Sequence, residues 1–162
     1  MAKQKEAKTN AMRILDRMKI SYKTYSYECG EFIDAQQTAA LLGIAHERMF
    51  KTLVTVSPAK SFFVFVIPID SELDLKKAAQ KAAQKSLSMI HVKDLLSVTG
   101  YVRGGCTAVG MKKQYPVFID ESARSHQQIV VSGGKIGLQI ELSPEDLSKA
   151  SDAVFADVIH LR

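Results

Sequence analysis

The stretch "KTLVTVSPAKSFFVFVIPI", residues 51–69, decides the fold class. It contains two apolar runs rich in Val, Phe and Thr, which are favoured in strands, on either side of Pro58, Ala59 and Lys60. This pattern predicts a β-hairpin. Because both runs are almost continuously apolar, we expect both faces of the two strands to be buried.

The segments on either side of this hairpin predict short helices mixed with further strands. Helices are expected at 9–19, 34–43, 74–85, 92–100 and 143–150, and strands at 21–27, 116–120, 127–142 (two strands around a glycine pair) and 153–160. Their order lacks a strict strand–helix–strand alternation, which favours an α+β domain with a mixed sheet over a doubly wound fold. We expect one domain over residues 1–162, with residues 1–8 as a flexible basic tail.

Composition limits the possible functions. A chain of 162 residues that is 46% hydrophobic and 24% charged suits one globular domain with its own core. It has no apolar run long enough to cross a membrane and no secretory signal, so we expect a cytoplasmic protein without membrane partners. Two distant cysteines and four scattered histidines predict neither a disulfide framework nor a metal site. The net charge of +5 fits either a solubilising role or an acidic partner.

Glycine is concentrated in one part of the chain. Seven of the nine glycines lie between Gly100 and Gly137, in two loops around Gly104 and Gly133. Successive glycine N–H groups can form a concavity that binds an anion or a developing oxyanion, although the same residues also suit plain turns. Neither loop matches a nucleotide-binding glycine motif. Lys51, at the start of an apolar strand, is either a lysine that reaches to solvent or a phosphate anchor.

Five segments in this order resemble the YbaK/EbsC family over nearly the whole chain: "FKTLV" (50–54), "DLKKAA" (74–79), "TGYVRGGC" (99–106), "GMKK" (110–113) and "VSGGKIGL" (131–138). The family comprises bacterial deacylases similar to the editing domain of prolyl-tRNA synthetase. The resemblance implies a single α+β domain with a mixed, partly barrel-like β-sheet surrounded by short α-helices. It also implies a trans-editing enzyme for mischarged tRNA, above all Cys-tRNA(Pro), with no cofactor and no metal.

The resemblance also assigns roles to individual residues. It implies that Lys51 holds the phosphate of the terminal adenosine and that the N–H of Gly104 faces the scissile carbonyl, which makes these two the candidate catalytic residues. The implied substrate-binding residues are Tyr25, Phe32, Thr52, Gly105, Ala108, Ser132, Gly133 and Gly134, and Lys112 and Lys113 are weaker candidates for contact with tRNA phosphates. Two positions depart from the family pattern: Ala108 replaces a proline, and Gln139 stands where some members carry an acidic residue.

The expected mechanism is positioning of an activated ester with stabilisation of its oxyanion, while the substrate's own thiol or a ribose hydroxyl takes part. The expected partners are the acceptor end of tRNA(Pro) and, as a further candidate, prolyl-tRNA synthetase. The alternative hypothesis is a module that binds tRNA or a synthetase without catalysis, or an EbsC-like regulatory module, on the same fold.

Overall fold

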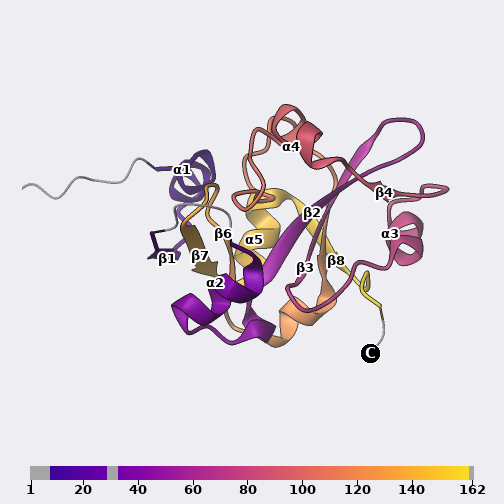
Figure 1. Ribbon diagram of the computed structural model, residues 1–162. Helices are drawn as coiled ribbons and strands as arrows, with labels where there is room; N and C mark the ends of the chain where they lie inside the picture. Colours follow the sequence, from indigo (N-terminus) through magenta and orange to yellow (C-terminus); the bar gives the residue numbers. More distant parts are fainter. Residues whose placement is uncertain (1–7, 29–32, 161–162) are drawn as a thin grey trace, which may run out of the picture.

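The computed structural model describes residues 8–28 and 33–160, which form two β-sheets and short helices (Figure 1). The α-helices are α1 (Asn10–Arg17), α2 (Ala35–Leu42), α3 (Leu75–Lys81), α4 (Val92–Thr99) and α5 (Pro144–Ser151), with 3-10 helices η1 (His46–Arg48) and η2 (Glu121–Ser125). The strands are β1 (Lys23–Ser26), β2 (Phe50–Val56), β3 (Phe62–Pro68), β4 (Ser88–Met89), β5 (Val117–Asp120), β6 (Ile129–Ser132), β7 (Leu138–Leu142) and β8 (Ala153–Ala156).

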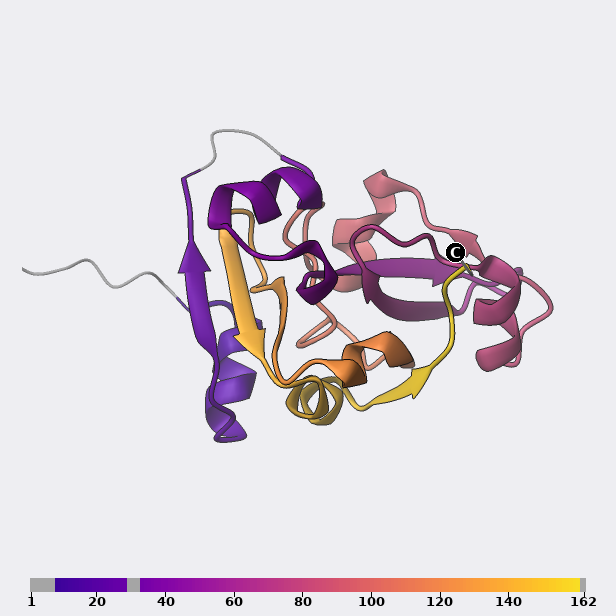
Figure 2. The ribbon, with the colours of Figure 1, turned by 90° about the horizontal axis from the view of Figure 1, so that it is seen from below.

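The strands divide into a three-stranded sheet, in the order β1-β7-β6, and a five-stranded sheet, in the order β4-β2-β3-β5-β8. All pairs are antiparallel except β3–β5 and β5–β8, so the larger sheet is mixed, as expected. An isolated bridge between Met49 and Val130 links the start of β2 to β6. Figure 2 shows the two sheets beside each other, with α2 close to the place where they approach. The predicted α+β class is confirmed, but the described strands form two sheets and no closed barrel.

The β2–β3 hairpin is the centre of the larger sheet. Its strands pair from Phe50–Pro68 to Val56–Phe62, which confirms the predicted hairpin. Successive side chains of a strand point to opposite faces, and in β3 both sets are buried. Val64 and Val66 join the main core with α1 and α5, whereas Phe63 and Phe65 pack against the alanines of α3. Helices on both sides of the sheet therefore explain why the hairpin is apolar throughout.

Local signals in the sequence set the bounds of α2. The Asp34 carboxylate accepts a hydrogen bond from the N–H of Gln37, and the Gln37 side chain accepts one from the N–H of Asp34, which completes a capping box. The helix ends at Gly43, whose φ of 68° lies in the left-handed region that glycine adopts without steric cost. The predicted range 34–43 therefore matches α2 together with its two cap residues, and the capping bonds hold the first turn of the helix in place.

The predicted helix at 74–85 is too long. Helix α3 ends at Lys81 because the chain turns through Ala83, with a φ of 56°, and brings Leu87 into the hydrophobic cluster beneath α3. Within α3, Lys77 donates hydrogen bonds to the Asp157 carboxylate and to the carbonyl of Ile159. No helix within the described ranges has the length and hydropathy needed to span a bilayer.

Candidate functional site

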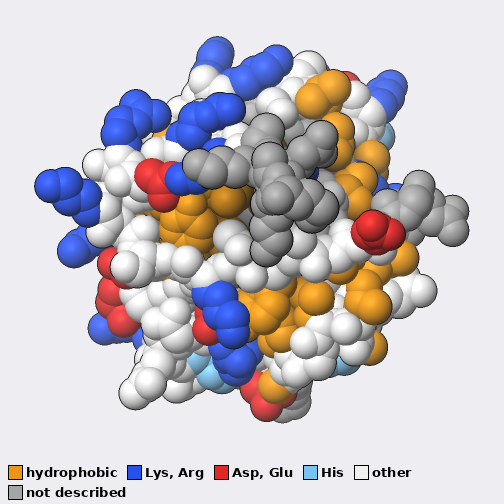
Figure 3. Space-filling view, turned by 90° about the vertical axis from the view of Figure 1, so that its left-hand side faces the viewer, with side chains coloured by type: hydrophobic (Ala, Val, Ile, Leu, Met, Phe, Trp, Pro, Cys, Tyr) orange, Lys and Arg blue, Asp and Glu red, His pale blue; other side chains and the backbone are white. Residues whose placement is uncertain are grey.

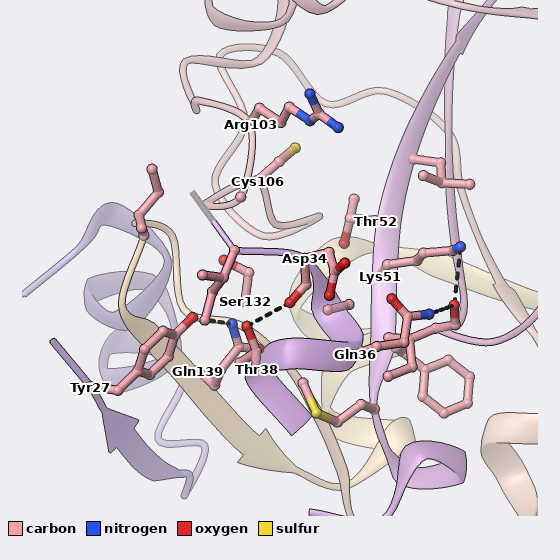
Figure 4. Close-up of a pocket in the computed structure, with 18 residues that line it drawn as sticks. Tyr27, Asp34, Gln36, Thr38, Lys51, Thr52, Arg103, Cys106, Ser132 and Gln139 are labelled. Carbon is pink, nitrogen blue, oxygen red and sulfur yellow. Dashed lines mark hydrogen bonds between the residues drawn. The ribbon is translucent and has the colours of Figure 1, made fainter. Parts of the chain in front are cut away.

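A cavity of about 350 Å³ lies where the two sheets approach each other (Figure 4). Its walls come from the first turn of α2, the start of β2, the loop that leads to Cys106, the end of β6 and the start of β7. These segments are far apart in the sequence, and the bridge between Met49 and Val130 holds two of the walls together. The site is therefore a product of the tertiary fold.

Lys51 forms part of the β2 wall. Its Nζ donates a hydrogen bond to the carbonyl of Ile69 at 3.2 Å, and Gln36 Nε2 donates to the same oxygen at 2.9 Å. Burial lowers the pKa of the Lys51 ammonium, whereas the nearby carboxylates of Asp70 and Glu72 act in the opposite direction. Among the described residues the hydrogen-bond acceptor of this ammonium is a neutral carbonyl, so an anion that enters the cavity can still pair with the cation. Lys51 is thus suited to bind a phosphate.

The glycine loop supplies a donor of another kind. Gly104 lines the cavity with a φ of 86°, and within the part of the chain that the structure describes its N–H donates no hydrogen bond. The next N–H, that of Gly105, donates to the carbonyl of Val102 at 2.9 Å. Gly105 also packs against the backbone of Lys135, where a Cβ would lie 2.8 Å from Cα. Gly104 therefore offers a main-chain N–H without a partner among the described residues, and Gly105 holds the two glycine loops together.

The remaining polar side chains contain no activated nucleophile. Ser132 Oγ accepts a hydrogen bond from the N–H of Gly134 at 3.2 Å, and Gln139 Nε2 donates to the Tyr27 hydroxyl at 3.4 Å. Burial raises the pKa of the Cys106 thiol to about 12, so it stays protonated and weakly nucleophilic near neutral pH. Among the described residues that line the cavity there is no histidine. This arrangement suits binding and polarisation of a reactive group better than attack by a protein side chain.

Within residues 8–28 and 33–160, no three His, Cys, Asp or Glu side chains gather closely enough to hold a metal ion. Two basic residues, in contrast, lie at the cavity or beside its glycine loop. Arg103 lines the cavity, and the backbone of Lys135 touches the glycine loop. Figure 3 shows Lys and Arg side chains gathered at the upper left of the face that carries α1 and β1. A surface of this kind suits a partner that carries phosphates.

Comparison with known proteins decides the family. A family model described as "Aminoacyl-tRNA editing domain" matches residues 31–150. The chain belongs to this aminoacyl-tRNA editing family. A relative from Enterococcus faecalis, named "Putative Cys-tRNA(Pro)/Cys-tRNA(Cys) deacylase EbsC", is 46% identical over 160 residues, which are 98% of each chain. The protein YwhH of Bacillus subtilis is 28% identical over 124 residues, which cover 76% of this chain and 78% of YwhH.

Solved structures confirm the editing-domain fold. The crystal structure of the hypothetical protein APE2540 superimposes with a TM-score of 0.86 at 23% identity, and covers 94% of this chain and 100% of that one. A candidate trans-editing enzyme for prolyl-tRNA synthetase has a TM-score of 0.80 at 20% identity, with 96% and 100% covered. At such identities the likeness establishes the fold, and the resemblance to the YbaK/EbsC family is confirmed by the family match and by EbsC.

The cavity of this editing domain brings together four of the residues named from the sequence: Lys51, Thr52, Gly104 and Ser132. Phe32 lies outside the described residues. Lys112 and Lys113 are exposed after α4 and do not line the cavity, so a role for them would lie with the rest of a tRNA.

The other predicted residues that the structure describes do not line the cavity. The Tyr25 hydroxyl donates a hydrogen bond to the Glu141 carboxylate at 2.8 Å, and Tyr27 lines the cavity instead. Ala108 is packed in the main hydrophobic core with 6% of its surface exposed, because the chain after the glycine loop turns inward. Gly133 and Gly134 form the β6–β7 turn, where the N–H of Gly133 donates to the carbonyl of Leu138. They support the position of Ser132 and do not themselves line the cavity.

Glu141 connects Tyr25 with a second residue outside the cavity. Arg48 donates a hydrogen bond to the same carboxylate oxygen at 2.6 Å. Burial alone would raise the pKa of Glu141, but the hydrogen bonds from Tyr25 and Arg48 outweigh burial and hold the pKa below its ordinary value. The group therefore joins β1, β7 and η1 and stabilises the small sheet while it is ionised.

Sequence reasoning missed several residues of the cavity wall. The sequence placed Asp34 and Gln36 only within a predicted helix, and Arg103 only within the segment that carries the glycines. The sequence did contain one signal for Arg103: it directly precedes Gly104, a candidate catalytic residue. Nothing in the sequence indicated that the first turn of α2 meets β2, because that contact depends on long-range packing.

Proposed function

We propose that this protein is a trans-editing aminoacyl-tRNA deacylase whose main substrate is Cys-tRNA(Pro). One observation carries the proposal: a half-buried cation, Lys51, lines the same cavity as the N–H of Gly104, a donor with no partner in residues 8–28 and 33–160, in a chain of the editing family. The family match supports deacylation in general, and the similarity to EbsC supports the cysteinyl substrate.

In the proposed reaction Lys51 binds the phosphate of the terminal nucleotide and so places the ester. The N–H of Gly104 donates to the carbonyl oxygen as negative charge develops on it, and one such donor contributes about 10²–10³ in rate. In the thiol route, the sulfur of the cysteinyl group bonds to the carbonyl carbon, the ester C–O bond breaks, and the thiol proton goes to the leaving ribose oxygen. Water then opens the resulting cyclic thioester to free cysteine. In the hydroxyl route, the neighbouring ribose hydroxyl orients a water whose oxygen bonds to the carbonyl carbon, and a proton of that water goes to the leaving ribose oxygen. The protein thus acts mainly by positioning.

The test is deacylation of Cys-tRNA(Pro), Ala-tRNA(Pro) and Pro-tRNA(Pro) by the wild type and by Lys51→Ala. We expect release of cysteine, with correctly charged Pro-tRNA(Pro) left intact. Loss of a charged contact is worth about 1.5–3 kcal/mol, so Lys51→Ala should lower kcat/KM about tenfold to a hundredfold. Lys149→Ala, which removes an exposed ammonium on α5, is the matched control and should keep the wild-type rate. A wild-type rate for Lys51→Ala would refute the role of Lys51.

A second candidate function is a module that binds tRNA or a synthetase without catalysis. The presence of Gln139 in the cavity wall, where some relatives carry an acidic residue, favours it. Binding of Cys-tRNA(Pro) without release of cysteine would select this alternative. Adding prolyl-tRNA synthetase to the same assay tests that partner, because a docked synthetase should raise the rate at low tRNA concentration.

A further inference from the structure

The cavity contains an unequal set of charges. Among the described residues that line it, Lys51 and Arg103 are cationic and Asp34 is the single carboxylate. In the proposed reaction Lys51 binds the phosphate of the substrate, and the N–H of Gly104 donates to its ester carbonyl. Neither the phosphate nor the carbonyl needs a carboxylate as a partner. Asp34 therefore requires a separate explanation.

Asp34 is held in one position by α2. Its Oδ1 accepts a hydrogen bond from the N–H of Gln37 at 2.7 Å, and its own N–H donates to Gln37 Oε1 at 2.9 Å. Its carbonyl also accepts from the Thr38 hydroxyl at 3.0 Å. Within the described residues the second oxygen, Oδ2, has no hydrogen-bond or ion-pair partner. Figure 4 shows the Asp34 carboxylate pointing into the cavity, on the side of Thr52. A fixed acceptor therefore faces a space enclosed by donors and cations.

An aminoacyl ester carries one cationic group, the α-ammonium, bonded to the carbon next to the scissile carbonyl. We propose that Asp34 Oδ2 accepts a hydrogen bond from this α-ammonium and so restricts the cavity to esters with a free amino group. This inference rests on the proposed function, because it concerns the substrate of that same cavity. Esters whose nitrogen is acylated, such as peptidyl-tRNA, lack the charge and gain bulk, so the cavity would reject them.

Asp34→Asn separates this role from the capping role. Asn and Asp are equally good N-cap residues, so the variant keeps the acceptor for the Gln37 N–H and should keep the melting temperature. With the amide oxygen in the capping position, an NH2 group replaces Oδ2, so the variant loses both the negative charge and the acceptor that face the cavity. A helix cap without further function therefore predicts no change in ligand preference.

The experiment measures binding by calorimetry, so it does not depend on turnover. The two probes are 3′-cysteinylamino-3′-deoxyadenosine, an amide analogue of the charged tRNA end, and its N-acetyl derivative. We expect the wild type to bind the free amine about tenfold to a hundredfold more tightly, the usual contribution of a charge-assisted hydrogen bond, and we expect Asp34→Asn to bind both about equally. The inference is overturned if the wild type shows no preference, if neither probe binds, or if the preference survives in Asp34→Asn.

Hydrolysis of Cys-tRNA(Pro) and of its N-acetyl form then separates the two proposals. If Asp34→Asn raises KM for Cys-tRNA(Pro) but not for its N-acetyl form, Asp34 recognises the α-ammonium. An equal fall in kcat for both esters would show that Asp34 acts as a general base, and would overturn the inference. If the wild type binds the free-amine probe selectively but hydrolyses neither ester, the inference about Asp34 stands and the proposed deacylase function is refuted.

Discussion

The contact between the two glycine loops can be tested at Gly105. A Cβ at this position would lie 2.8 Å from Lys135 Cα and 2.9 Å from its carbonyl carbon. The first distance is about 0.7 Å shorter than the roughly 3.5 Å at which two carbon atoms make a favourable contact. Because both partners are backbone atoms, no side chain can turn aside, and Gly105→Ala must push the loops apart. Overpacking of this kind costs about 1–3 kcal/mol.

The stability change should be visible in thermal unfolding. For a chain of this size 1 kcal/mol shifts the midpoint by about 2–4 °C, so Gly105→Ala should melt about 2–12 °C below the wild type. The separation of the loops also moves the N–H of the adjacent Gly104. A displacement of about 1 Å can lower a catalysed rate about 100-fold. We therefore expect a loss in kcat for Cys-tRNA(Pro) far larger than the loss in folded protein.

Gly43→Ala is the matched control, because no atom lies within 4 Å of its added Cβ and the site is remote from the glycine loops. Because Gly43 has a φ of 68°, where a side chain is strained, the Gly43→Ala variant should lose about 1 kcal/mol of stability and keep its activity. A wild-type melting temperature and rate for Gly105→Ala would refute the argument that the two loops position the donor.

Two further predictions concern charge. The depressed pKa of Glu141 stabilises the protein above the ordinary pKa of 4.5, and this contribution is lost as the pH falls below 4.5 through the folded-state value. The difference in urea midpoint between the wild type and Glu141→Gln should therefore be largest at pH 7 and shrink below pH 4.5; a constant difference would contradict the assignment. If Lys112 and Lys113 contact tRNA phosphates, replacing both with Ala should reduce the slope of log kcat/KM against log salt concentration by about one to two. An unchanged slope would exclude both lysines from the tRNA contact.

The sequence alone determined the elements whose signals are local. Asp34, Gln37 and Gly43 fixed both ends of α2, because capping bonds join residues three or four positions apart. The hairpin at 50–68 followed from its apolar runs and its turn. The family motif also identified four residues of the cavity wall. It could do so because the resemblance to a family assigns roles to residues, which rules based on local spacing cannot do.

Only the tertiary structure decided which side chains meet at the cavity. Tyr27 lines it in place of Tyr25, and Ala108 lies in the core instead of the wall. Asp34 became a candidate for substrate recognition only when α2 was seen to pack beside β2. Such contacts depend on how the two sheets and the glycine loops pack against each other, and they join residues as distant in the sequence as Tyr27 and Gln139, which are 112 positions apart. No rule based on local spacing contains that information, because the packing energy is shared by the whole core.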